Sequence, residues 1–247
     1  MSRAAMITEA GDSSNRPVRR QSLAVGVATG LYGISFGALA VAAGLTLWQT
    51  VALSVLMFTG GSQFAYVGVI GAGGGGPAAV GAATLLGARN GVYGLQLAGA
   101  LRPRGWRRLV AAHLTIDEST AVSVAQRGRA HQRLGFWLTG SAVFVFWNVM
   151  TAAGALLGDR LGDPSRYGLD AMAAAAFLAL LWPRLTRREP QVVAVGAAVV
   201  AVVCVPVVPA GLPVLVAAVV ALAVAAVDRR PTRPEESEPV RHVEDPS

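Results

Sequence analysis

Residues 22–44 read SLAVGVATGLYGISFGALAVAAG, a run without a single charged side chain. A helix needs about 20 predominantly apolar residues to cross the hydrocarbon layer of a bilayer, and this run is long enough to do so. The composition of the whole chain also indicates a membrane protein, because 53% of its residues are hydrophobic and only 14% are charged. Soluble domains usually carry about 25% charged residues. The sequence therefore predicts an integral membrane protein.

Further apolar segments follow the first one. Backbone groups in lipid need partners within the protein, so we expect each segment to be helical. The predicted fold is an all-α polytopic membrane protein with seven to eight membrane-embedded segments, some of them broken or re-entrant. We expect residues 1–21 to form a cytoplasmic N-terminal tail, 22–227 a transmembrane transport domain, and 228–247 a disordered C-terminal tail. The apolar segments are 22–44, 49–70, 77–101, 109–126, 134–157, 168–183, 191–208 and 212–227.

The charged and sulfur-containing residues exclude several classes of function. All 21 basic residues are arginines, the formal net charge is +7, and the arginines cluster between the apolar segments. This distribution is typical of cytoplasmic loops in membrane proteins and does not favour nucleic acid as a partner. Cys204 is the single cysteine, so the chain has no disulfide framework and no cysteine-based metal site. Without metal-ligand spacing or a catalytic motif, we expect no metal, no cofactor and no enzymatic activity.

The arginines also constrain how the chain crosses the membrane. Loops 102–108 and 127–133 are both basic, yet they flank the single segment 109–126. A full crossing by that segment would put the two loops on opposite sides. Both loops and both termini are cytoplasmic if segment 109–126 and one early segment are broken or re-entrant. The alternative is one exception to the positive-inside rule.

The first predicted break lies in FTGGSQF, residues 58–64. Gly60 and Gly61 each cost about 1 kcal/mol in a helix interior relative to alanine, and Ser62 is a good N-cap residue. We expect one helix to stop near Gly60 and another to start near Ser62. The alternative is that the glycines allow close helix packing, the role expected of the small residues in the first segment. Those residues are Gly26, Gly30, Gly33 and Gly37.

The second predicted break lies in HLTIDESTAVSV, residues 113–124. Thr115 and Glu118 have the spacing of a capping box, which predicts a helix beginning at Thr115. Asp117 and Glu118 would then lie in the first turn, where the helix dipole favours negative charge. The alternative is that the capping box lies at the membrane surface, where lipid headgroups solvate both acids.

Arg89 is the single charged residue between Ser22 and Leu101. A cation at membrane depth usually faces a partner or a water-filled cavity, and the nearby acids are its obvious counter-charges. We expect one acid to pair with Arg89 and the other to be available for a substrate or a proton. A purely structural ion pair is the alternative. Half-helix N-termini that hold an anion, together with an internal acid, would suit an amino-acid-sized zwitterion.

Five motifs together resemble the AzlC family of branched-chain amino-acid permeases. They extend the resemblance over residues 23–225, essentially the whole membrane part. The resemblance implies a multi-pass protein of the bacterial cytoplasmic (inner) membrane that exports valine, leucine, isoleucine and related residues such as methionine. It also implies a small AzlD-type membrane subunit as partner. The motifs are GISFGALAVAAG (33–44), FTGGSQFA (58–65), ARNGVYG (88–94), DESTA (117–121) and GDPSRYGLDAMAAAAF (162–177).

The resemblance also supplies candidate substrate-binding or coupling residues. The family often has Asn-x-Arg-His before the tyrosine, whereas this chain has Gly87 and Asn90 at the first and last of these positions. Coupling to an ion gradient and a homo-oligomer are further expectations. Two other hypotheses stay open: a membrane-embedded enzyme acting on a lipid-linked substrate, and a non-transporting scaffold subunit. The candidate residues are Gly60, Ser62, Gln63, Arg89, Tyr93, Asp117 and Glu118.

Overall fold

The computed structural model describes residues 3–161, 178, 181–182, 185–208 and 212–227. This part of the chain contains helices and no strand, which confirms the all-α prediction for it. Most of the predicted segment 168–183 and the whole predicted tail 228–247 lie outside the described residues. In chain order the helices are α1 (Arg3–Ala42), α2 (Leu47–Leu56), α3 (Gly60–Gly71), α4 (Gly76–Leu101), α5 (Trp106–His113), α6 (Asp117–Ala125), α7 (Arg129–Leu161), α9 (Arg188–Cys204) and α10 (Leu212–Val227).

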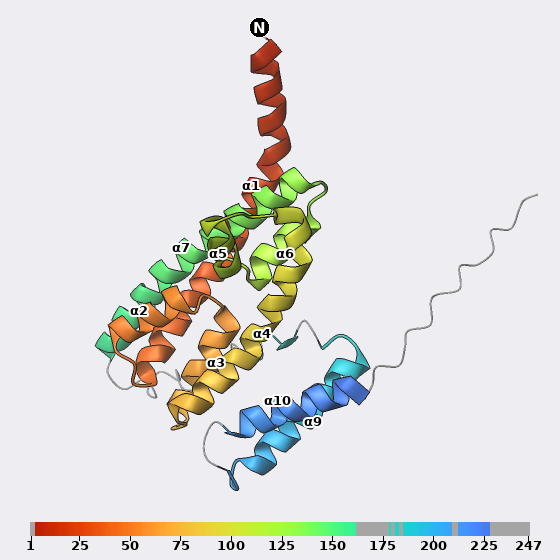
Figure 1. The fold of residues 1–247 in the computed structure, drawn as a ribbon. Coiled ribbons are helices and arrows are strands. Elements are labelled where there is room, and N and C mark those ends of the chain that lie inside the picture. Colours follow the sequence, from red (N-terminus) through yellow and green to blue (C-terminus); the bar gives the residue numbers. More distant parts are fainter. Residues whose placement is uncertain (1–2, 162–177, 179–180, 183–184, 209–211, 228–247) are drawn as a thin grey trace, which may run out of the picture.

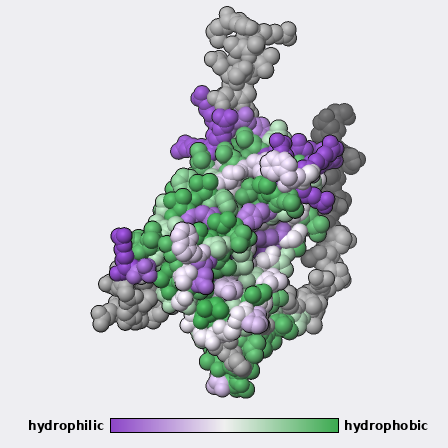
Figure 2. Space-filling view, turned by 60° about the vertical axis from the view of Figure 1, so that its left-hand side comes forward, coloured by the Kyte–Doolittle hydropathy of each residue, from purple (hydrophilic) through white to green (hydrophobic). Residues whose placement is uncertain are grey.

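Two of the described helices are long and apolar enough to cross a membrane by length and composition. They cover Asn15–Ala42 in α1 and Arg129–Arg160 in α7. The predicted count of seven to eight membrane-embedded segments is therefore not confirmed. Figure 2 shows many hydrophobic residues on the middle of one face, with polar residues among them, and strongly hydrophilic residues gathered mainly at the upper end and the left edge. An apolar middle between polar ends is the surface that a bilayer requires.

Small residues on α1 let it pack directly against the backbone of α7. A Cβ atom added at Gly26 would lie 2.6 Å from the Cβ of Ala142, and one at Gly33 would lie 2.6 Å from the Trp147 carbonyl. A Cβ at Gly37 would collide with the backbone of Thr151. Close approach through small residues is a common way of packing helices in membranes. The predicted packing role of the glycines in the first segment is confirmed.

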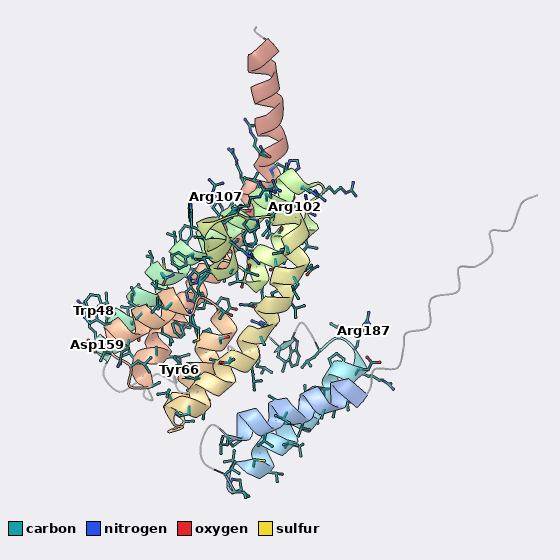
Figure 3. The ribbon with its side chains drawn as sticks, in the orientation of Figure 1. Trp48, Tyr66, Arg102, Arg107, Asp159 and Arg187 are labelled. Carbon is teal, nitrogen blue, oxygen red and sulfur yellow. The ribbon has the colours of Figure 1, made fainter. Side chains whose placement is uncertain are left out.

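The predicted segments 49–70 and 109–126 are each divided into two short helices, as expected. The hairpin α2–α3 begins and ends at the lower end of the bundle, whereas α5–α6 begins and ends at the upper end (Figure 1). Helix α4 connects the two ends. Figure 3 places Trp48 and Tyr66 at the lower end and Arg102 and Arg107 at the upper end. The two broken segments therefore enter the bundle from opposite ends.

Both basic loops lie at the upper end, beside the arginines of α1. Arg133, at the start of α7, donates through Nε to the carbonyl of Ala100 near the end of α4 (2.9 Å). Gln126, after α6, donates through Nε2 to Oε1 of Gln21 on α1 (3.0 Å). These contacts bring loops 102–108 and 127–133 to the same end. The broken-helix explanation of the arginine pattern requires this arrangement.

The described chain begins and ends with helices. Residues 3–21, predicted as a tail, continue the first spanning helix without interruption, and α1 projects beyond the bundle at its N-terminal end (Figure 1). At the other end of the described chain, α9 and α10 pack against each other, and α10 also contacts α4.

Candidate functional site

The first break places an extended segment between α2 and α3. Helix α2 ends at Leu56 and α3 begins at Gly60, with Thr59 in the extended region (φ −158°, ψ 101°) as its N-cap. The helix restarts two residues before Ser62, so the predicted restart is confirmed, but the N-cap is Thr59 and Ser62 lies inside the first turn of α3. Because Gly61 has no side chain, Arg89 can lie close to the start of α3: a Cβ at Gly61 would lie 3.0 Å from Nη2 of Arg89.

Gln63 holds this break together. Its Nε2 donates to the carbonyls of Met57 (2.8 Å) and Ser54 (3.2 Å), and its Oε1 accepts from Nε1 of Trp147 (2.9 Å). The last carbonyls of a helix have no intrahelical donor, so this amide replaces the donors that α2 lacks. The side chain is fully buried. Gln63, one of the candidate substrate-binding or coupling residues, therefore makes structural hydrogen bonds in this break.

The second break places Asp117 and Glu118 in the first turn of α6, as expected. The predicted capping box is wrong in its residues, because the N-cap is Ile116 and the partner is Ser119. The Ile116 amide donates to Oγ of Ser119 (3.1 Å). The predicted cap, Thr115, donates its hydroxyl to the carbonyl of Ala111 (2.7 Å) in α5. That carbonyl has lost its helical donor at the break, and the threonine hydroxyl supplies one.

Arg89 pairs with Asp117. Nη2 of Arg89, on α4, lies 2.8 Å from Oδ2 of Asp117, and the two side chains are 32% and 28% exposed. The prediction that Arg89 pairs with one of the two acids is confirmed. Among the described residues, no ion pair involves the neighbouring Glu118. The two adjacent acids therefore have different surroundings.

A cavity of about 390 Å³ lies where the two breaks meet α1, α4 and α7. This volume is within the range of about 300–1,000 Å³ typical of small-molecule sites. Of the candidate residues, Gly60, Arg89, Asp117 and Glu118 line the cavity. The other three, Ser62, Gln63 and Tyr93, are not among the residues that line it.

Aromatic residues form an apolar wall that the sequence did not reveal. Phe58 and Phe64 come from the first break, and Trp147 comes from α7. The ring of Phe64 packs edge-on against Trp147, with centroids 6.2 Å apart. One signal was available, because Trp147 lies in the middle of its segment rather than near an end. A buried indole N–H needs an acceptor there, and Gln63 provides it.

The charged residues, open helix ends and aromatic wall together allow reversible binding of a ligand with both charged and apolar parts. In the part of the chain that the structure describes, no group of three or more His, Cys, Asp or Glu side chains could hold a metal ion. His113 lies near the acids, but its ring packs between Phe58 and Phe144, with centroids 5.8 and 5.7 Å away.

The family model described as AzlC protein matches residues 24–161, which is more than half of the chain. The match includes both breaks and all seven candidate residues. No curated protein and no solved structure matches the chain. The matched family is a transporter family associated with branched-chain amino-acid transport. The chain belongs to the AzlC family, and the resemblance is confirmed over residues 24–161; the fifth motif, at 162–177, lies outside the match.

Proposed function

We propose that this AzlC-family chain is the transport subunit of an exporter for branched-chain and other hydrophobic amino acids, driven by an ion gradient. One observation carries the proposal: a single cavity contains an acid that has no ion pair with any described residue, an open helix N-terminus and an aromatic wall. Each of these features matches one part of a hydrophobic amino acid. The acid suits the ammonium group, the helix N-terminus suits the carboxylate, and the wall suits the side chain.

The N-terminus of α3 is the proposed carboxylate site. The amides of residues 60–62 precede the first hydrogen bond at the start of α3, which runs from the Gln63 amide to the Thr59 carbonyl (3.1 Å). The Thr59 side chain does not cap them. Open amides and the positive end of the helix dipole favour an anion. Gly60 and Gly61 both line the cavity, and neither has a side chain that would cover these amides.

Glu118 is the proposed ammonium or proton site. It lines the cavity, and its neighbour Asp117 is engaged by Arg89. We assign Asp117 and Arg89 as positioning residues, which fix the start of α6 and hence the place of Glu118. Of the two carboxylates in the cavity, Glu118 is then the one that can exchange partners during transport.

The aromatic wall accounts for a preference for large aliphatic side chains. Phe58, Phe64, Val143 and Trp147 present an apolar surface to the cavity. A missing methylene in a hydrophobic pocket costs about 1–3 kcal/mol, or roughly 10- to 200-fold in discrimination. On this proposal, valine, leucine, isoleucine and methionine are exported in preference to alanine.

The proposal also covers the orientation of the protein in the membrane and its partner subunit. The arginine-rich upper end faces the cytoplasm of a bacterial inner membrane, and a small AzlD-type subunit is the partner. Reporter domains fused at Gly105 and Gly128 should both report the cytoplasmic side, because both positions belong to the basic upper-end loops. Reporters that give opposite sides would overturn this orientation.

Export can be tested in cells loaded with dipeptides that contain valine or leucine, by following release of the free amino acid. We expect Glu118→Gln to abolish release while expression and membrane insertion persist. Glu189→Gln is the matched control, because Glu189 lies at the start of α9 and outside the residues that line the cavity. Wild-type release by Glu118→Gln would remove this acid from the mechanism. Release that does not depend on the protein at all would overturn the proposed function.

A further inference from the structure

Helix α5 presents exposed apolar and basic residues side by side at the upper end of the bundle. Trp106 is 71% exposed and Leu109 is 75% exposed. Residues three apart lie on the same face of a helix, so the two apolar side chains are neighbours. Arg107 and Arg108 lie between them in the sequence and are also exposed. The guanidinium of Arg107 lies 5.9 Å from the ring centre of Trp106.

The basic residues of this region have no acidic residues near them in the sequence. No Asp or Glu occurs between Asp12 and Asp117, and the next acid after Glu118 is Asp159. Figure 3 places Asp159 at the opposite end of the bundle from Arg107. Arginines with no acidic neighbours form a surface that attracts anions. In and just before α5, the exposed arginines are Arg102, Arg104, Arg107 and Arg108.

We propose that α5 and the turn before it bind the headgroup of an anionic phospholipid. The phosphate is held by Arg104, Arg107 and Arg108, and the acyl chains lie against Trp106 and Leu109. A short helix with aromatic and aliphatic residues beside arginines is typical of a helix that lies in the membrane interface. A free phosphate ion would not account for the exposed tryptophan and leucine, whereas a lipid uses both kinds of contact.

A lipid bound at α5 would act on the transport cavity through short connections. The last residue of α5, His113, packs against Phe58, which lines the cavity. Thr115, in the break, donates its hydroxyl to Ala111 of α5 (2.7 Å). Asp117 follows two residues later. A lipid that fixes the position of α5 therefore also fixes the start of α6, so anionic lipid should support transport.

The binding test uses the purified full-length protein in lipid nanodiscs of phosphatidylcholine with increasing phosphatidylglycerol. Phosphatidylglycerol bound to the protein is measured by native mass spectrometry. We expect Arg107→Gln/Arg108→Gln to weaken retention about 25-fold, since each arginine near an anionic surface contributes about fivefold. The matched control is Arg127→Gln/Arg129→Gln, which removes two exposed arginines from the other upper-end loop. Equal losses in both variants, or no loss in either, would overturn a lipid site at α5.

The functional test uses the same variants in liposomes. Phosphatidylglycerol should raise amino-acid transport by the wild type and by the Arg127→Gln/Arg129→Gln control, and it should not raise transport by the α5 variant. Added inorganic phosphate should not replace the lipid; if it does, the site binds phosphate and the lipid proposal is wrong. This test of transport rests on the proposed function, whereas lipid retention does not. A protein that retains lipid at α5 but exports no amino acid would refute the function and leave the lipid site intact.

Discussion

Separating Arg89 from Asp117 is the perturbation that tests the centre of the proposed site most directly. The two groups come from α4 and α6, and their closest atoms are 2.8 Å apart. Arg89→Gln leaves Asp117 without its cation, and Asp117→Asn leaves Arg89 without its anion. The double variant removes both charges, so neither charge remains without its counter-charge.

The expected magnitude follows from the exposure of the pair. Exposed ion pairs contribute about 0.2–1 kcal/mol, whereas removing one partner of a buried pair costs about 3–5 kcal/mol. The two side chains are 32% and 28% exposed, so water screens part of their interaction. We therefore expect each single substitution to lower the free energy of unfolding by about 1–3 kcal/mol. The coupling energy between the two substitutions should be about 1 kcal/mol.

The free energies can be measured by reversible unfolding in mixed detergent micelles, with Arg127→Gln as a control for loss of an exposed arginine. The double variant should be at least as stable as the less stable single variant. It should still fail to export, because Glu118 is no longer positioned. If the destabilisation by the double variant equals the sum of the two single effects within about 0.3 kcal/mol, the pair does not interact energetically and the reasoning is refuted. Export by the double variant at the wild-type rate would refute the positioning role.

Three further predictions concern the break, the helix packing and the substrate. Gln63→Leu should destabilise the protein by about 2–4 kcal/mol in the same unfolding assay, because it leaves several buried polar groups unpaired. Gly37→Leu should prevent stable accumulation in membranes, measured by immunoblot, whereas Gly99→Ala should be tolerated because a Cβ at Gly99 meets nothing within 4 Å. Arginine and glutamate should compete poorly with labelled leucine for binding to the purified protein, and equal competition by either would contradict selection of a net-neutral ligand.

Local signals in the sequence were sufficient to predict that two segments break, but not where each helix begins. A glycine pair and a Thr-x-x-Glu spacing identified both regions. The choice of N-cap depended on contacts made elsewhere in the fold. In the second break, the hydroxyl of Thr115 bonds to α5, and Ser119 accepts from the amide of Ile116 at the start of α6. No periodicity in the sequence shows that a carbonyl of the preceding helix is within reach.

Charge pairing was predictable for a different reason. Arg89 is isolated in a long uncharged region, and an isolated cation at membrane depth needs an anion. Which acid it would choose was not predictable, since Asp117 and Glu118 are adjacent. The aromatic wall was even harder to predict, because Trp147 reaches the cavity only through the packing of α7 against α1. That packing depends on glycines whose effect is seen in the backbone approach and not in any side-chain pattern.

The arrangement of the two broken segments explains why a pair of acids can be stable at this depth. A long helix followed by a broken hairpin occurs twice in opposite directions, as α1 with α2–α3 and as α4 with α5–α6. Both half-helix N-termini therefore meet at the cavity, and each contributes about half of a positive elementary charge. Together with Arg89 they supply about two positive charges, as many as the negative charges that two carboxylates can carry. A zwitterion adds no net charge to this balance, whereas a cationic or anionic amino acid leaves one charge uncompensated in a medium that solvates it poorly. On the proposed function, selection for a net-neutral substrate follows from the helix ends and the ion pair together, and the aromatic wall distinguishes only the size of the substrate's side chain.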